Sequence, residues 1–219
     1  MLTRFSHLRK KNMPDRTYVY VDGESHFIRS ECAWRKLHGE HARLEQLRHK
    51  GQKDGKLILV DASAKIFWTR KMNPGVHRAY CFTSIVGDEP ALHAIRVSLR
   101  DFGFDPMVER ERKQLACQRQ NALLNQHLIE KPKGVDIALA VQMLEDSLRA
   151  FDVCHLYTSD VDFVPVIKAV RSRGKQVFVH GYKDGLSDSS PMFHVCDLFS
   201  DLEELLRDQC ELDRSTDDR

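Results

Sequence analysis

Short runs with the character of strands, alternating at residues 17–21 and mainly apolar elsewhere, occur at five places along the chain, and longer stretches with a helical period lie between them. Runs rich in β-branched and aromatic residues predict strands at residues 17–21, 77–86, 104–109, 153–158 and 175–181. Amphipathic patterns predict helices at residues 25–37, 88–102, 135–150 and 161–173. Because strands and helices alternate and the strands are largely apolar, the pattern predicts a doubly wound, mostly parallel α/β sheet with helices on both faces.

The remaining segments carry weaker signals. Short apolar runs at residues 57–60 and 65–68 are candidate strands, separated from the first helix by a very polar stretch at residues 38–56. Residues 184–190 read as a loop, and a short strand at 198–199 precedes a final helix from about residue 202. The chain therefore divides into a basic N-terminal tail (1–16), one domain (17–200), and a C-terminal helix with an acidic tail (201–219).

Length and composition set the broad class. The chain has 219 residues, 42% of them hydrophobic, which is enough for one α/β domain with a real core. A net charge of only +2 excludes a global basic field. No stretch approaches the roughly 18 apolar residues of a membrane-spanning helix, and the N-terminus has no apolar signal core, so we expect a cytoplasmic protein with no membrane partner. The six cysteines are scattered without a Cys-Xaa-Xaa-Cys pair, which argues against a structural zinc site.

Four aspartates stand where an apolar stretch ends or a helix begins: Asp22, Asp136, Asp160 and Asp162. Aspartate is a poor strand former, and a buried unpaired carboxylate is costly, so strands that end in aspartate favour a site over a core. Ligands of open α/β sheets bind outside the carboxyl ends of the strands. Several carboxylates there repel one another unless a proton or a cation compensates, and a hard divalent ion is the usual solution.

Each aspartate also has a purely structural interpretation. Asp160 and Asp162 can cap the helix that follows them, although one residue would suffice for that. Asp22 before Gly23 can belong to a plain turn. Asp136 in the first turn of a helix interacts favourably with the helix dipole, and taken alone it reads as structural.

Three motifs in order resemble the NYN domain, a member of the PIN-like nuclease superfamily. They are Val-Asp-Gly-Glu-Ser at 21–25, Lys-Gly-Val-Asp-Ile-Ala-Leu at 133–139 and Thr-Ser-Asp-Val-Asp-Phe-Val-Pro at 158–165, and the resemblance covers roughly residues 17–200. It implies metal-dependent cleavage of RNA phosphodiester bonds, with Mg²⁺ or Mn²⁺ as the cofactor. Carried over by position, Asp22, Asp136, Asp160 and Asp162 would be both the catalytic and the metal-binding carboxylates.

The sequence departs from the family pattern at two positions. Ser25 stands where the family commonly has Asn, and Gln142 stands where many members have Asp. Serine can still position a water or a phosphate, so Ser25 and Ser159 are expected to contact substrate. Glutamine cannot supply charge, and these two changes keep open the alternative of a catalytically weak RNA-binding or scaffold protein that retains the NYN fold.

A basic, amide-rich stretch precedes the second motif. Within it Arg112, Lys113, Lys131 and Lys133 offer a track for a phosphate backbone, weighed against a merely solvated surface. The expected partner is single-stranded RNA, and the oligomeric state, a homo-oligomer included, is open. A phosphatase that uses two aspartates spaced as Asp160 and Asp162 are is a less favoured third interpretation, because the first strand lacks the matching second aspartate.

Overall fold

Six parallel strands form one sheet in the computed structural model. It describes residues 15–26, 29–30, 32–33, 36, 76–85, 88–101, 103–110, 134–184, 186–204 and 207. The strands are β1 (Thr17–Asp22), β2 (Val76–Ile85), β3 (Asp105–Arg110), β4 (Val153–Tyr157), β5 (Gln176–Gly181) and β6 (Leu198–Asp201). Their spatial order is β3-β2-β1-β4-β5-β6, and every neighbouring pair is parallel.

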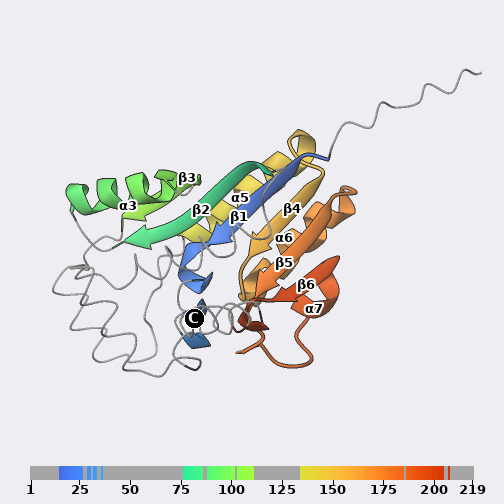
Figure 1. Ribbon diagram of the computed structural model, residues 1–219. Coiled ribbons are helices and arrows are strands. Elements are labelled where there is room, and N and C mark those ends of the chain that lie inside the picture. Colours follow the sequence, from blue (N-terminus) through green and yellow to red (C-terminus); the bar gives the residue numbers. More distant parts are fainter. Residues whose placement is uncertain are drawn as a thin grey trace, which may run out of the picture.

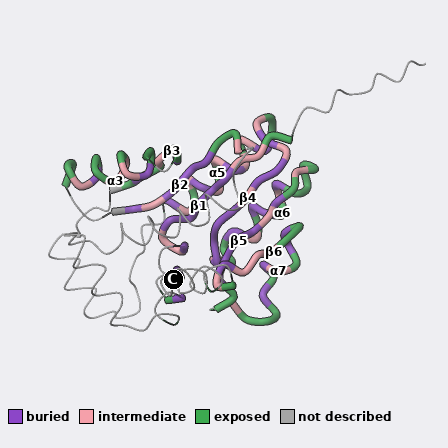
Figure 2. Tube along the Cα trace, in the orientation of Figure 1, coloured by how far each residue is buried: buried purple, intermediate pink, exposed green. Residues whose placement is uncertain are grey.

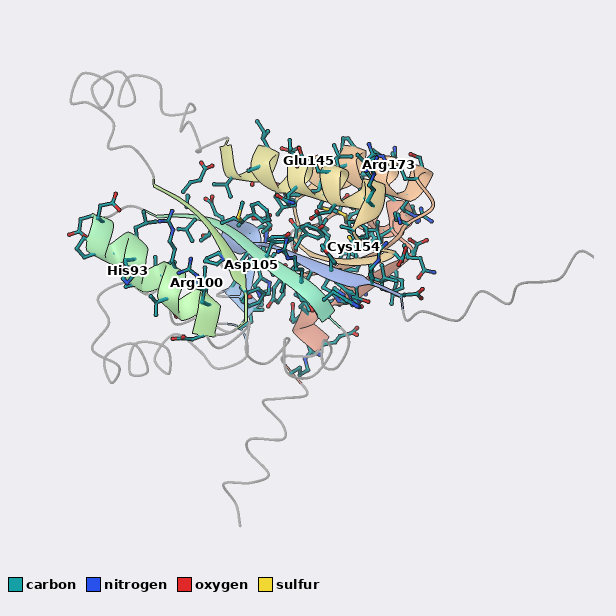
Figure 3. The ribbon with its side chains drawn as sticks, turned by 90° about the horizontal axis from the view of Figure 1, so that it is seen from above. His93, Arg100, Asp105, Glu145, Cys154 and Arg173 are labelled. Carbon is teal, nitrogen blue, oxygen red and sulfur yellow. The ribbon has the colours of Figure 1, made fainter. Side chains whose placement is uncertain are left out.

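Helices cover both faces of this sheet (Figure 1). Seen from above, α5 (Gly134–Arg149) and α6 (Val164–Ser172) lie on one face, where Glu145 and Arg173 are at the outer surface, and α3 (Glu89–Asp101) lies on the other (Figure 3). A 3-10 turn, η1 (Val161–Phe163), leads into α6, and α7 (Met192–Val195) lies between β5 and β6. Residues 23–26, directly after β1, are helical.

Two hydrophobic cores lie on either side of the sheet, and the central strands are the most buried part of the molecule (Figure 2). Alternate side chains of β1 point to opposite faces of the sheet and so contribute to both cores. Tyr20 packs with α5 residues such as Leu139, while Val19 and Val21 pack with α3 residues such as Leu92. A strand that is apolar on both sides is what a parallel sheet with two helical layers requires.

The strand order reverses direction between β1 and β4. From β1 the chain adds β2 and β3 on one side, and it then crosses back through α5 to add β4, β5 and β6 on the other. The segments that follow β1 and β4 therefore pack against opposite faces of the sheet. At such a switch point, open α/β sheets bind ligands in a crevice outside the carboxyl ends of the strands.

The predicted fold class is confirmed, and eight of the nine main predicted strands and helices have close counterparts. The ninth, the helix at 25–37, lies only partly within the described residues, and those of its residues that are described are helical. One difference concerns residues 161–173, which form η1 followed by α6 instead of one helix. Pro165 lacks a backbone N–H and is tolerated only in the first turn, so the α-helix begins at Val164. The candidate strands at 57–60 and 65–68 lie outside the described residues. No helix in the described part of the chain has the length and apolarity needed to cross a membrane.

Candidate functional site

Asp22 is the most deeply buried acid of the candidate site. It is the last residue of β1, faces the α5 side of the sheet and is 3% exposed. The Thr158 hydroxyl donates a hydrogen bond to its Oδ2 at 2.8 Å, and the Ser25 backbone N–H donates to its Oδ1 at 3.1 Å. Both carboxylate oxygens are thus held, as a buried acid requires.

The pKa of Asp22 reflects a balance of burial and neighbours. Burial raises it from 3.8 to about 7, against the hydrogen bonds from Thr158 and Ser25, which lower it. The nearby negative charges of Asp136 and Asp160 raise it further. The three carboxylates are therefore near enough to repel one another, although they come from β1, α5 and the segment after β4.

Asp160 caps the helix that follows it and also belongs to the group of neighbouring carboxylates. Its backbone N–H donates to the Thr158 hydroxyl at 3.0 Å, so this one hydroxyl connects Asp160 to Asp22. Its Oδ1 accepts from the Asp162 backbone N–H at 2.9 Å and caps η1. Asp160 is half-buried, whereas Asp162 is exposed at the same edge of the sheet.

Ser25 and Ser159 join the ends of three strands. The Ser159 backbone N–H donates to the Ser25 hydroxyl at 3.2 Å, and the Ser159 hydroxyl accepts from the Tyr182 backbone N–H at 2.8 Å. These bonds run from the turn after β1 through the end of β4 to the end of β5. Both hydroxyls are thus part of the frame that supports the carboxylates, and their predicted contact with substrate stays a prediction.

Glycine makes this close packing feasible. A Cβ on Gly23 would lie 2.7 Å from the Phe82 carbonyl oxygen, which is closer than real Cβ atoms come. A Cβ on Gly181 would meet the Thr158 carbonyl oxygen and would lie 2.9 Å from the Ser159 hydroxyl. Both positions require a residue without a Cβ, so that neighbouring strands can end at the same level.

Asp136 enters the group from the first turn of α5, where it is half-buried. Glu109, near the end of β3, packs against the start of the same helix, because a Cβ on Gly134 would lie 3.0 Å from its Oε2. Gln142 is a turn and a half further along, and its amide donates to Asp146 at 3.1 Å. Asp146 also accepts from the Tyr20 hydroxyl at 2.8 Å, so Gln142 belongs to a separate polar network.

The structure thus brings Asp22, Asp136 and Asp160 together at the carboxyl end of the sheet, with Asp162 at the same edge. The predicted basic residues Arg112, Lys113, Lys131 and Lys133 lie outside the described residues. Tyr182, which follows β5, is 1% exposed and shares a 2.7 Å hydrogen bond with Ser30, so it is part of the core.

Carboxylate oxygens are the right donors for Mg²⁺ or Mn²⁺. Burial is the main cause of the raised pKa of Asp22, and the smaller repulsion from Asp136 and Asp160 is the kind that a cation relieves. Within the described residues, no three or more His, Cys, Asp or Glu side chains are grouped closely enough to hold a metal ion. Magnesium needs only one or two carboxylates because it retains several water ligands. The donor set therefore fits a hydrated divalent cation and does not fit an all-protein cage.

Thr158 is the residue whose importance the sequence did not reveal. In the sequence Thr158 is only the first residue of the third motif and has no role of its own. Its hydrogen bond to Asp22 depends on the pairing of β1 with β4. Glu109 was likewise missed, because it reads as an ordinary polar position in a strand. Its place at the carboxyl end of an edge strand is the signal that was available.

Comparisons with known proteins bear on the family and the fold. The NYN domain family model matches residues 16–203. The curated proteins contain no match. Among solved structures, a protein of unknown function from Vibrio parahaemolyticus is similar with a TM-score of 0.56 at 15% sequence identity, over 88% of this chain and 95% of that one. At that identity the likeness concerns the fold alone.

Proposed function

The chain belongs to the NYN domain family, whose members are generally nucleases, and on that premise we propose that it is a metal-dependent ribonuclease. The observation that carries the proposal is the junction at the ends of β1 and β4, where one hydroxyl connects Asp22 to Asp160 and Asp136 approaches from α5. The reaction would be hydrolysis of an RNA phosphodiester bond. The crevice outside the carboxyl ends of the strands is where an open α/β sheet binds ligands.

One or two of the carboxylates of Asp22, Asp136 and Asp160 would bind Mg²⁺ or Mn²⁺ directly, and the rest of the group would act through the water molecules that complete the coordination. A bound ion would activate a water molecule and neutralise charge that develops on the phosphate oxygens. Asp162, exposed and two residues after Asp160, is suited to water-mediated contact at the rim.

The protein's own contribution is to fix the carboxylates before substrate arrives. Thr158 donates to the Asp22 carboxylate and accepts from the Asp160 backbone N–H, and the Asp160 carboxylate accepts from the Asp162 backbone N–H, so neither carboxylate can turn away without losing a hydrogen bond. The bond between Ser159 and Ser25 ties the same two strand ends a second time. Supporting contacts of this kind orient metal ligands, and their loss costs metal sites about 10–100-fold in affinity or activity.

The alternative is a catalytically weak RNA-binding or scaffold protein. It is favoured by Gln142, whose amide is engaged with Asp146 and supplies no charge to the carboxylate group. It is also favoured by Ser25, whose hydroxyl accepts from a backbone N–H.

A cleavage assay separates the two functions. We expect the wild-type protein to cleave a fluorescently labelled single-stranded RNA with Mg²⁺ or Mn²⁺ and not in EDTA. Asp160→Asn should reduce the rate by about 100-fold or more, and Thr158→Val by about 10–100-fold. The matched control is Asp105→Asn, which removes a carboxylate at the opposite end of the sheet, beside Arg78.

Each outcome has a definite meaning. Equal cleavage by wild type and Asp160→Asn would contradict the proposed site. Tight RNA binding by a wild-type protein that does not cleave with either metal would establish the RNA-binding alternative.

A further inference from the structure

A small pocket lies beside the candidate site, between the edge strand β3 and the start of α5. Its volume is about 200 Å³. Its apolar wall includes Phe82, Met107, Val135 and Ala138, and its polar groups come from Arg96 and Glu109. Pockets for drug-sized ligands have volumes of roughly 300–1,000 Å³, so this one suits a single small ring system.

The pocket is lined by residues next to those of the carboxylate group. Val135 in its wall directly precedes Asp136, and Glu109 at its rim packs against Gly134 at the start of the same helix. Phe82 pairs with Asp22 across the β1–β2 ladder. Two strand spacings of about 4.8 Å place the pocket roughly 10 Å from the strand of Asp22, within reach of a nucleotide next to a phosphate held at the carboxylates.

We propose that this pocket binds one nucleobase of the RNA strand, adjacent to the phosphate that is cleaved. This inference rests on the proposed ribonuclease function. Met107, which is 39% exposed, and the half-buried Ala138 would contact the face of the base, as sequence-tolerant single-strand binding requires, while the buried Phe82 and Val135 form the floor beneath them. Arg96 can donate to carbonyl or ring-nitrogen acceptors of the base, and Glu109 can accept from its amino or imino groups.

Arg96 is held in place for this role. One of its guanidinium nitrogens donates to the Val108 carbonyl at 3.2 Å, which anchors the side chain of this α3 residue at β3. A guanidinium carries five N–H donors, so this bond uses only part of its capacity.

A protein occupant fits the pocket less well. Ile137 and Val141, on the same helix, are 62% and 46% exposed and could extend an apolar contact surface. A partner that covered the pocket with apolar side chains would, however, bury Arg96 and Glu109, whose desolvation is costly. A nucleobase can satisfy both with its own polar edge.

The test uses a single-stranded RNA and a series of copies, each with one abasic nucleotide at a different distance from the cleaved bond. With wild-type protein, one abasic position should raise KM by about tenfold, the value of one stacked base, while kcat changes little. Ala138→Leu, which fills the pocket, should raise KM for intact RNA by a similar factor and remove the sensitivity to that abasic position. Val141→Leu, on the same helix but outside the pocket, is the matched control and should behave as wild type.

A second variant and a binding readout make the test independent of one substitution. Glu109→Gln should weaken binding of intact RNA and leave unchanged the binding of the RNA that lacks the critical base. Fluorescence anisotropy with the Asp160→Asn protein measures both without cleavage. Thermal melts establish that each variant is folded.

The inference is overturned if all abasic positions cost the same in wild type, or if Ala138→Leu leaves KM and RNA affinity unchanged. Loss of self-association in sedimentation by Ala138→Leu, with RNA binding intact, would instead identify a surface between two copies of the chain. Absence of cleavage by wild type counts against the ribonuclease proposal, and the anisotropy comparison then still decides whether the pocket recognises a base.

Discussion

Thr158 shows how much of the candidate site depends on one small side chain. Its hydroxyl donates to Asp22 and accepts from the Asp160 backbone, so it uses donor and acceptor capacity at once. Valine has nearly the same shape but neither capacity, and it would leave the buried Asp22 short of a partner. Serine would keep both bonds, so Thr158→Ser serves as the conservative counterpart of Thr158→Val in the cleavage assay.

Asp22 should make stability depend on pH in an unusual direction. Its folded pKa of about 7 lies above the unfolded value of 3.8, so the folded state holds this proton more tightly. The contribution is fully present below about pH 4 and is lost as the pH rises through 7. Each pKa unit is worth about 1.4 kcal/mol, so in EDTA Asp22→Asn should equal or exceed the wild-type free energy of unfolding at pH 8 and fall below it at pH 4.

The difference between the two proteins is the quantity to measure, because His26 acts in the opposite direction. Burial lowers the pKa of His26 from 6.5 to about 4, so its contribution is lost as the pH falls. Urea unfolding of both proteins at a series of pH values cancels the His26 contribution. A difference that does not change between pH 4 and 8 would contradict the raised pKa of Asp22.

Gly181 should be intolerant of any side chain. We expect Gly181→Ala to lower the free energy of unfolding by about 1–3 kcal/mol and to reduce RNA cleavage, because the new Cβ would push against the end of β4 that carries Ser159. Gly174→Ala is the control: its φ of 75° imposes strain of about 1–2 kcal/mol, but nothing lies within 4 Å of the added Cβ. Equal effects of the two variants on cleavage would contradict the close-approach explanation.

At the scale of elements, Asp197 links α6, β5 and the start of β6 through hydrogen bonds. Its carboxylate accepts from two Arg171 nitrogens of α6 at 3.1 and 2.7 Å and from the Val177 backbone N–H of β5 at 2.8 Å. Asp197 itself precedes β6. Burial acts to raise the pKa of Asp197, but the Val177 and Arg171 bonds outweigh it and hold the pKa below the ordinary value.

Asp197→Asn should therefore lower the free energy of unfolding by about 1–2 kcal/mol at pH 7. Because the folded pKa is depressed, the wild-type advantage is present above pH 4 and is lost as the pH falls below it. The control is Asp184→Asn, which breaks a surface ion pair with Lys36 and should cost less than about 1 kcal/mol. Chemical denaturation at pH 7 and pH 3 measures both, and an equal cost for the two variants would show that the bidentate geometry adds nothing.

Elements were easier to predict from the sequence than the contacts between them. The alternating residues of β1 and the amphipathic pattern of α5 carry their own period, so their positions follow from the chain alone. The division of residues 161–173 into η1 and α6 depended on how one proline is accommodated. The link from Thr158 to Asp22 could not be predicted, because it exists only where β4 pairs with β1.

At the scale of the whole molecule, the clustered carboxylates should make stability respond to divalent cations. Mg²⁺ or Mn²⁺ that binds only the folded state at 100 times its Kd adds about 2.7 kcal/mol, which for a chain of this size raises Tm by about 5–10 °C. Asp22→Asn should abolish most of the rise. Identical melts of the wild-type protein in EDTA and in millimolar metal, with no heat of binding by calorimetry, would contradict a metal site.

The sheet order has a consequence for the protein during its own synthesis. The Thr158–Asp22 hydrogen bond joins residues 136 positions apart, and β4 is added to β1 only after β2, β3 and α5 have been made. Domains fold on the ribosome from the N-terminus as the chain emerges, so a nascent chain carries Asp22 long before it can acquire Asp160. The proposed ribonuclease would therefore be inactive while most of its own messenger RNA is still being translated beside it.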